Sequence, residues 1–150
     1  MSRKKIIHAL VLIFVLAVPL MGWAEDLLVI VNAKNPTAAL SSAEVRKYFL
    51  KEQVTWPNGE KVRSVDRLGN TSEKRTFLER IVKLSDDELE QFWVSKRYEK
   101  GIPVPPKLHS DNEVIEYVLS FDGAIGYVNA KSVGPAQRSQ IKVINTIPMQ

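Results

Sequence analysis

The sequence predicts an α/β fold in which a mixed sheet carries helices on both of its faces. One observation is the apolar run from Leu27 to Val31, which has the length and composition of a buried strand. A second is a Ser-x-x-Glu pattern that occurs three times ahead of an amphipathic segment, because this pattern caps the first turn of a helix. The strand-like and helix-like segments alternate, and this order is typical of a layered α/β sheet.

Strands and helices are expected in alternation from residue 26 onward. Residues 26–32 are apolar almost without a break, so this strand should lie inside the sheet with both faces covered. The capping sequence Ser41-Ser-Ala-Glu44 then starts a helix. The sequence Trp56-Pro-Asn-Gly59 indicates a turn. After this turn, residues 61–66 alternate in polarity and are expected to form the second strand.

The middle of the chain is expected to be helical. Residues 72–84 carry apolar side chains at helical spacing, and Asn70 or Thr71 caps them. The sequence Ser85-Asp-Asp-Glu88 caps the next helix, which ends at Gly101.

The last third contains a connector, a helix and two strands. Residues 102–107 include three prolines, which leave only an extended connector. Ser110-Asp-Asn-Glu113 starts the last helix, and strands are expected at 124–128 and 141–144. The core should contain apolar residues from all of these elements: Val29, Ile30, Phe77, Ile81, Phe92, Trp93, Val118 and Ile125.

Residues 1–24 have the features of a secretory signal peptide. A basic start at residues 3–5 precedes an apolar run, and Gly22 and Ala24 occupy the −3 and −1 positions of a cleavage site. A retained membrane anchor is the alternative, since the apolar run approaches the roughly 20 residues that span a bilayer. We expect cleavage after Ala24, export to the periplasm and a single domain at residues 25–150.

The mature segment is nearly balanced in charge. The whole chain has a formal net charge of +4, but three of its 21 Lys and Arg residues lie in the predicted signal peptide, which leaves 18 basic residues against 17 acidic ones. This balance gives no indication of a nucleic-acid partner. The chain has no cysteine, which excludes disulfides, thiolate metal ligands and a lipid-carrying cysteine at the cleavage point.

The residues that most enzyme mechanisms need are missing. His109 is the only histidine of residues 25–150, and the sequence has neither a Gly-x-Ser-x-Gly nor a nucleotide-binding glycine pattern. Asp86 and Asp87 lie in the first turn of a predicted helix, where the backbone dipole favours negative charge. We therefore expect no enzyme activity, no metal and no cofactor, and we expect His109 to be solvated.

The best candidate binding site is the segment that runs from Asp66 into the following helix. A loop rich in hydroxyl and amide side chains leads into a helix N-terminus, where free backbone N–H groups attract an anion. Arg67 offers a guanidinium to an oxyanion, and Asn70, Thr71 and Ser72 supply further donors. In the alternative interpretation, the loop only caps the helix and its basic side chains are solvated.

The order of these landmarks resembles the periplasmic phosphate-binding proteins of ABC transporters, and in particular their short single-lobe relatives. The resemblance runs from Leu27 to about Val133, and the ending Gly123-Ala-Ile-Gly-Tyr127 is its most specific part. The other matching pieces are Val29-Ile-Val-Asn32, Asn35-Pro36, Leu40-Ser41, Val45, Tyr48-Phe49, Trp56, Arg67, Phe77, Trp93 and the connector from Gly101 to Pro106.

The resemblance implies one lobe of a fold that has two lobes closing on a ligand. It matches Arg67 to the arginine of an Arg-x-x-Gly-Ser-Gly-Thr anion loop and places residues 70–72 in that loop. This chain has Thr71-Ser72-Glu73 instead of the Ser-Gly-Thr triplet, so Glu73 puts a negative charge where a donor is expected. With one lobe only, we expect oxyanion binding no tighter than roughly millimolar.

Two functions follow as hypotheses. The first is a periplasmic solute-binding module that binds phosphate or a related oxyanion weakly, through Arg67 and the loop up to Ser72. The alternative is a ligand-free interaction or signalling module that contacts an envelope transporter or sensor, which one patch of exposed Tyr48, Trp56 and Tyr98 would favour. Neither involves nucleic acid or, after cleavage, a membrane. Burial of Arg67 in a structural ion pair would rule out a pocket that Arg67 shares with residues 70–72, and the interaction module would take its place.

The exported protein should begin at Glu25, because the small residues Gly22 and Ala24 lie in cleavage register ahead of it. N-terminal sequencing of the protein purified from the periplasm checks this. A chain recovered from the membrane fraction that still begins at Met1 would contradict the cleavage and support the retained membrane anchor.

Overall fold

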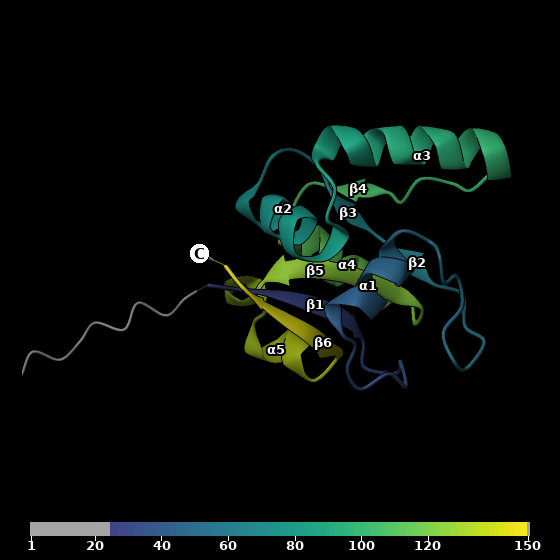
Figure 1. The fold of residues 1–150 in the computed structure, drawn as a ribbon. Helices are drawn as coiled ribbons and strands as arrows, with labels where there is room; N and C mark the ends of the chain where they lie inside the picture. The colour runs from purple at the N-terminus through teal and green to yellow at the C-terminus, as the bar shows by residue number, and fades with distance from the viewer. Residues whose placement is uncertain (1–24, 150) are drawn as a thin grey trace, which may run out of the picture.

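The computed structural model describes residues 25–149, and it confirms the mixed α/β fold (Figure 1). The predicted signal peptide lies outside the described residues. The main sheet has the strand order β2-β5-β1-β6, in which β1 is antiparallel to β5 and β6 while β2 is parallel to β5. Its strands are β1 (Asp26–Asn32), β2 (Arg63–Ser64), β5 (Ala124–Asn129) and β6 (Ile141–Pro148).

The helices follow the predicted order, and the short elements between them were not all predicted. The π-helical turn η1 continues α2 directly. The helical elements are α1 (Ser42–Phe49), α2 (Ser72–Phe77), η1 (Leu78–Val82), α3 (Asp86–Lys100), α4 (Asp111–Ser120), the short 3-10 turn η2 (Ala130–Ser132) and α5 (Pro135–Arg138). Within residues 25–149, no helix has the length and apolar composition needed to span a bilayer.

The predicted caps fix where the longer helices begin. Ser41 and Ser85 form full capping boxes at the starts of α1 and α3. The third predicted box is half formed: Ser110 caps α4, but the Glu113 carboxylate accepts from the backbone N–H of His109 instead of that of Ser110. The capping prediction was therefore correct for position and partly wrong for the hydrogen bonds.

The predicted strand at 61–66 is divided in the structure. β2 ends at Ser64, and β3 (Asp66–Arg67) pairs in parallel with β4 (Lys107–Leu108) in a separate two-stranded sheet. β4 begins at Lys107, the last residue of the proline-rich segment that was expected to be only an extended connector. Prolines lack an N–H but keep their carbonyl, and the Asp66 N–H donates to the Pro106 oxygen at 2.9 Å. Pairing therefore remains possible next to the prolines.

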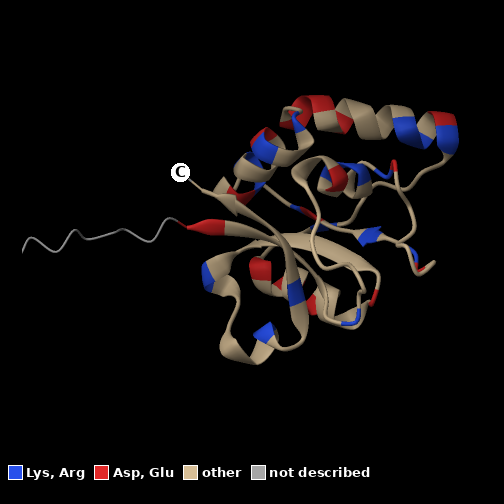
Figure 2. Ribbon diagram, turned by 60° about the horizontal axis from the view of Figure 1, so that its bottom comes forward, with Lys and Arg blue, Asp and Glu red and all other residues tan. Residues whose placement is uncertain are grey.

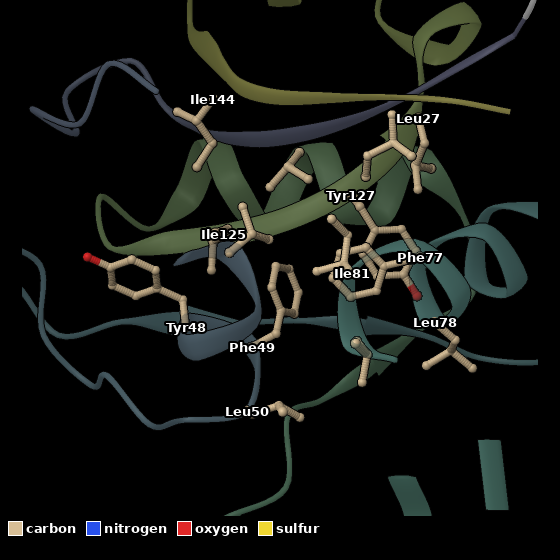
Figure 3. Close-up of a cluster of buried hydrophobic side chains, with 14 of the residues drawn as sticks. Leu27, Tyr48, Phe49, Leu50, Phe77, Leu78, Ile81, Ile125, Tyr127 and Ile144 are labelled. Carbon is tan, nitrogen blue, oxygen red and sulfur yellow. The ribbon is translucent and has the colours of Figure 1, made fainter. Parts of the chain in front are cut away.

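Two hydrophobic cores lie on opposite faces of the main sheet. One face of the sheet packs on α1, α2, η1 and α3, and the other packs on α4. On the first face, the ring of Phe77 stacks on Tyr127 with centroids 4.0 Å apart (Figure 3). Of the predicted core residues, Phe92 alone is only partly buried. The expectation of helices on both faces is confirmed.

Tyr48, Trp56 and Tyr98 do not form the exposed aromatic patch that would favour an interaction module. Tyr48 and Trp56 are 4% and 2% exposed, and their rings stack with centroids 4.4 Å apart. The indole N–H of Trp56 donates to the Gly123 carbonyl at 3.0 Å, which explains why this ring is held inside. Tyr98 is 86% exposed and is the one member of the expected set at the surface.

Replacing Gly126 in β5 by alanine should destabilise the protein, because an added Cβ would lie 2.5 Å from Val114 Cγ1 and 3.0 Å from Val65 Cγ2. We expect Gly126→Ala to lower the free energy of unfolding by about 1–3 kcal/mol, measured by urea denaturation. Val114→Ala removes the nearer contact, so the double variant should lose less than the sum of the two single losses. Strict additivity would show that the contact with Val114 is not the cause.

Candidate functional site

Arg67, the central residue of the predicted site, is buried. It is the second residue of β3 and is 5% exposed. Its guanidinium Nη1 forms an ion pair with the carboxylate of Asp111, the first residue of α4. Its Nε has no hydrogen-bond partner among residues 25–149. Arg67 is therefore not solvated, and its guanidinium is paired with a carboxylate. This outcome rules out the pocket that the sequence predicted for Arg67 and residues 70–72.

The Asp111 carboxylate collects three donors from three elements. Besides Arg67 Nη1, the Ser132 hydroxyl donates to it at 2.6 Å and the backbone N–H of Asn129 donates at 3.1 Å. A guanidinium, a hydroxyl and a backbone N–H are the kinds of group with which proteins bind an oxyanion. Asp111 thus takes up the donors that a small anionic ligand would use.

A shallow hollow surrounds this ion pair. Its volume is about 280 Å³, and it is lined by Arg67, Asp111, Ser132 and the loop residues 109, 110 and 112. His109 is exposed at its rim, as predicted for a solvated residue before a helix. Asp111 and Ser132 were missed as site residues, because the sequence indicated only a cap for the first and gave no signal for the second.

The predicted donor loop faces a different part of the surface. Thr71 caps α2 and accepts from the backbone N–H of Lys74 at 3.2 Å. The backbone and side-chain oxygens of Asn70 accept from Arg75 Nη1 at 2.9 and 3.3 Å. Asn70 lines a separate hollow of about 680 Å³ together with Arg75 and the start of α3. The structure therefore does not bring Arg67 and residues 70–72 into one pocket, since capping and local contacts occupy the loop.

Ser72 and Glu73 line neither of these two hollows. The Ser72 hydroxyl donates to a Glu73 carboxylate oxygen at 3.3 Å, and Asn129 Nδ2 donates to the other oxygen at 3.4 Å. Burial raises the pKa of Glu73, but hydrogen bonds from its own N–H, Asn129, Thr71 and Ser72 lower it by more, so the net pKa is below its ordinary value. Glu73 thus keeps its negative charge near Asn129, which itself binds Asp111.

Lys74 is a second buried cation. It is 3% exposed, and its Nζ lies 3.0 Å from Asp86 and 3.5 Å from Asp66. Burial lowers the pKa of Lys74, and the two carboxylates raise it by more. Asp66 also accepts from the Tyr127 hydroxyl at 2.6 Å, and burial together with Asp66 raises the pKa of Tyr127 well above its ordinary value.

This region has no surplus positive charge that could attract an anion. The two buried cations, Arg67 and Lys74, face three carboxylates, those of Asp66, Asp86 and Asp111. Within the described residues there is also no group of three or more side chains able to hold a metal ion. The two cations are therefore neutralised by carboxylates of the chain itself.

Asp111→Asn should destabilise the protein by about 3 kcal/mol, because it leaves the charge of a buried arginine without its partner. Chemical denaturation followed by circular dichroism measures this. Asp122→Asn is the matched control: the same charge is removed from an exposed residue whose ion pair with Lys34 spans 3.8 Å, and the loss should stay within about 0.5 kcal/mol. Equal losses in the two variants would contradict a structural role for the Arg67–Asp111 pair.

Comparison with known proteins identifies the fold. No protein-family model and no curated protein matches the sequence. Among solved structures, the chain is similar to an ABC-type phosphate transport receptor from Vibrio cholerae, with a TM-score of 0.62 and 17% identity over 81% of this chain and 46% of the receptor. The chain is also similar to a substrate-binding protein with bound phosphate from Clostridium perfringens, with a TM-score of 0.59 and 16% identity over 81% of this chain and 44% of that protein. For PstS from Borrelia burgdorferi, the TM-score is 0.54 and the identity is 21% over 81% of this chain and 47% of PstS. The chain therefore has the fold of part of the substrate-binding proteins of phosphate ABC transporters, and it spans less than half of their length.

Proposed function

We propose that this chain is a solute-binding-like module of the periplasm in which its own Asp111 holds the place of an anionic ligand. The observation that supports the proposal is the set of three donors, from Arg67, Ser132 and the Asn129 N–H, that converge on one carboxylate. Phosphate or a related small oxyanion binds weakly, because it competes with Asp111 for these donors. The periplasmic location follows from the signal-peptide pattern of residues 1–24.

The charge balance supports weak binding. Three carboxylates already face the two buried cations, so a phosphate dianion adds repulsion unless Asp111 moves away. Glu73, held in its charged form, lies near Asn129 and opposes a second anion further. A dissociation constant of 1 mM corresponds to only about −4 kcal/mol, and the monomer should bind phosphate more weakly than that.

A ligand-free interaction module, docking on an envelope transporter or sensor, is the second candidate. Burial of Arg67 in an ion pair favours it. The aromatic patch first considered for it is not available, since Tyr48 and Trp56 are buried. Exposed Val94 and Tyr98 on α3 are the surface residues that support this candidate instead.

Removing the Asp111 carboxylate should turn the weak site into a measurable one. We expect calorimetry on the purified protein to give a dissociation constant for phosphate above roughly 1 mM for the parent chain and at least about tenfold lower for Asp111→Ser. The shorter side chain frees the Arg67 guanidinium, the Ser132 hydroxyl and the Asn129 N–H for the ligand. Phosphate should also raise the melting temperature of this variant by more than that of the parent.

Asp122→Ser serves as the control, because it removes one exposed negative charge far from these donors. It should bind phosphate as weakly as the parent. Amide chemical shifts at residues 109–112 and 130–132 report whether the ion binds in the hollow. If Asp111→Ser folds and shows neither binding nor shifts there, the oxyanion proposal fails and the interaction candidate takes its place.

A further inference from the structure

A basic hollow lies where α1, η1 and the end of β6 meet. Its volume is about 570 Å³, and it is lined by the first residues of α1, the end of η1 and residues 146–148 of β6. Three cations, Arg46, Arg80 and Lys83, line this basic hollow, and no carboxylate does. Figure 2 marks the basic positions of the segment from α2 to η1 in blue, ahead of the red first turn of α3. The basic hollow shares no lining residue with the hollow at Asp111.

The chain itself neutralises the positive charge of the basic hollow only weakly. Arg46 donates from Nε to the Val82 carbonyl at 2.8 Å, which fixes the position of its guanidinium, and its ion pair with Glu52 spans 3.5 Å. Within the described residues, Arg80 pairs only with its sequence neighbour Glu79, at 3.9 Å. Both carboxylates are exposed, and exposed pairs at such distances contribute little. The basic hollow therefore still attracts a negatively charged group.

Lys83 occupies a backbone position that suits glycine better than lysine. It follows the π-helical turn η1, and its N–H donates to the Leu78 carbonyl at 2.7 Å. Its φ of 60° lies in the left-handed region, which is unfavourable for a residue with a side chain but not for glycine. Strained backbone of this kind is concentrated at binding and catalytic sites. Lys83 makes no ion pair within residues 25–149, so the chain itself does not use this charge.

The end of β6 presents unpaired backbone groups to the same hollow. β6 is an edge strand of the main sheet. The Ile144 carbonyl points away from β1, to the Leu40 N–H, whereas the Met149 N–H points inward, to the Glu25 carbonyl. Since successive residues of an antiparallel strand alternate in this respect, the N–H and C=O of Thr146 point away from β1. Neither group has a backbone partner outside the ladder in the described part of the chain, so an extended segment of another protein can pair with them.

We propose that the basic hollow binds an acidic, extended segment of a partner protein. The carboxylates of the segment contact the three cations, and its backbone pairs with Thr146. Pro148 has no N–H, so this pairing is short and the charges supply most of the attraction. The interface is small, and the complex is therefore weak. This inference uses none of the residues around Asp111 and does not rest on the oxyanion proposal.

Two other anionic partners fit the basic hollow less well. Its lining includes the apolar side chains of Ala43, Ile81 and Ile147 between the cations. Inorganic phosphate has no apolar atoms to cover them, whereas a peptide segment can place an apolar side chain there. The surface of a bilayer is flat and does not enter a hollow. An acidic peptide segment therefore matches both the charge and the shape of the basic hollow.

A labelled peptide tests the basic hollow directly. In a short peptide in which glutamate alternates with leucine, an extended backbone presents the carboxylates on one side and the apolar side chains on the other. Fluorescence polarisation with the purified protein should give a dissociation constant between about 10 µM and 1 mM, and added salt should weaken the binding. Amide chemical shifts should change at residues 42–43, 80–83 and 146–147. The same peptide with lysine in place of glutamate should not bind.

Several outcomes of this experiment would overturn the proposal. These are no binding up to about 1 mM peptide, shift changes confined to other residues, or vesicles that contain phosphatidylglycerol binding where the peptide does not. Excess inorganic phosphate at constant ionic strength should leave the peptide bound, and displacement would show that both use the hollow at Asp111. The two proposals fail separately, because phosphate titration of Asp111→Ser reports on that other hollow.

Lys83→Gly removes one charge of the basic hollow without straining the backbone, because glycine adopts this φ freely. Peptide binding should weaken about threefold to fivefold, while the stability measured by urea denaturation should not fall. Lys51→Gly is the matched control: Lys51 also has a positive φ, of 54°, but it lies beyond the other end of α1 and does not line the basic hollow. It should bind the peptide as the parent does. Equal weakening in the two variants would mean that only the net charge matters, and the proposal would be wrong.

Thr146→Pro tests the pairing with an extended backbone. It removes the outward N–H and leaves the ladder with β1 in place, since proline is tolerated at edge positions whose N–H faces away from the sheet. Peptide binding should weaken severalfold, whereas Thr146→Ala keeps the N–H and should bind as the parent does. Circular dichroism checks the fold of both variants. A folded Thr146→Pro that binds the peptide like the parent would exclude the strand pairing, and with it an extended segment as the occupant.

Discussion

Burying Arg67 and Lys74 near the end of β5 is possible only because carboxylates contact both side chains. A charged group inside a protein is stable only when it is paired and hydrogen-bonded. The Asp111 carboxylate forms an ion pair with Arg67, and the carboxylates of Asp66 and Asp86 form ion pairs with Lys74. These residues belong to β3, α2, α3 and α4, so the ion pairs join four elements that are separate in the sequence. The arrangement of that edge of the sheet depends on this neutralisation.

The same neutralisation limits what the edge can bind. A free guanidinium beside a hydroxyl and a backbone N–H suits an oxyanion, and all three groups are present. In this chain they converge on Asp111. Likeness of fold to phosphate-binding proteins therefore does not carry their ligand across, because a site depends on which groups remain available and not on the backbone around them.

Packing is tight around the main sheet and loose at α3. β1 and β5 are buried on both faces, and Gly126 leaves no room for a methyl group between Val65 and Val114. In contrast, only Leu89 and Trp93 of α3 are buried and Phe92 is partly buried, while Asp86 and Glu90 form ion pairs with Lys74 and Lys107. The first region determines the fold, whereas the second can change or gain partners at little cost to it.

The sequence by itself determined the elements whose causes are local. The apolar run of β1, the caps at Ser41 and Ser85 and the terminating Gly101 each act within a few residues, so their positions were predicted correctly. The division of residues 61–66 between two sheets was not predictable, because it depends on pairing with β4 some 40 residues later. The partners of the candidate site residues were not predictable for the same reason. Arg67 was correctly placed in a polar segment, but its partner Asp111 lies 44 residues away and looked only like the first residue of a helix. Tertiary structure alone decided which charges met, because in sequence a buried ion pair is indistinguishable from two separate surface charges.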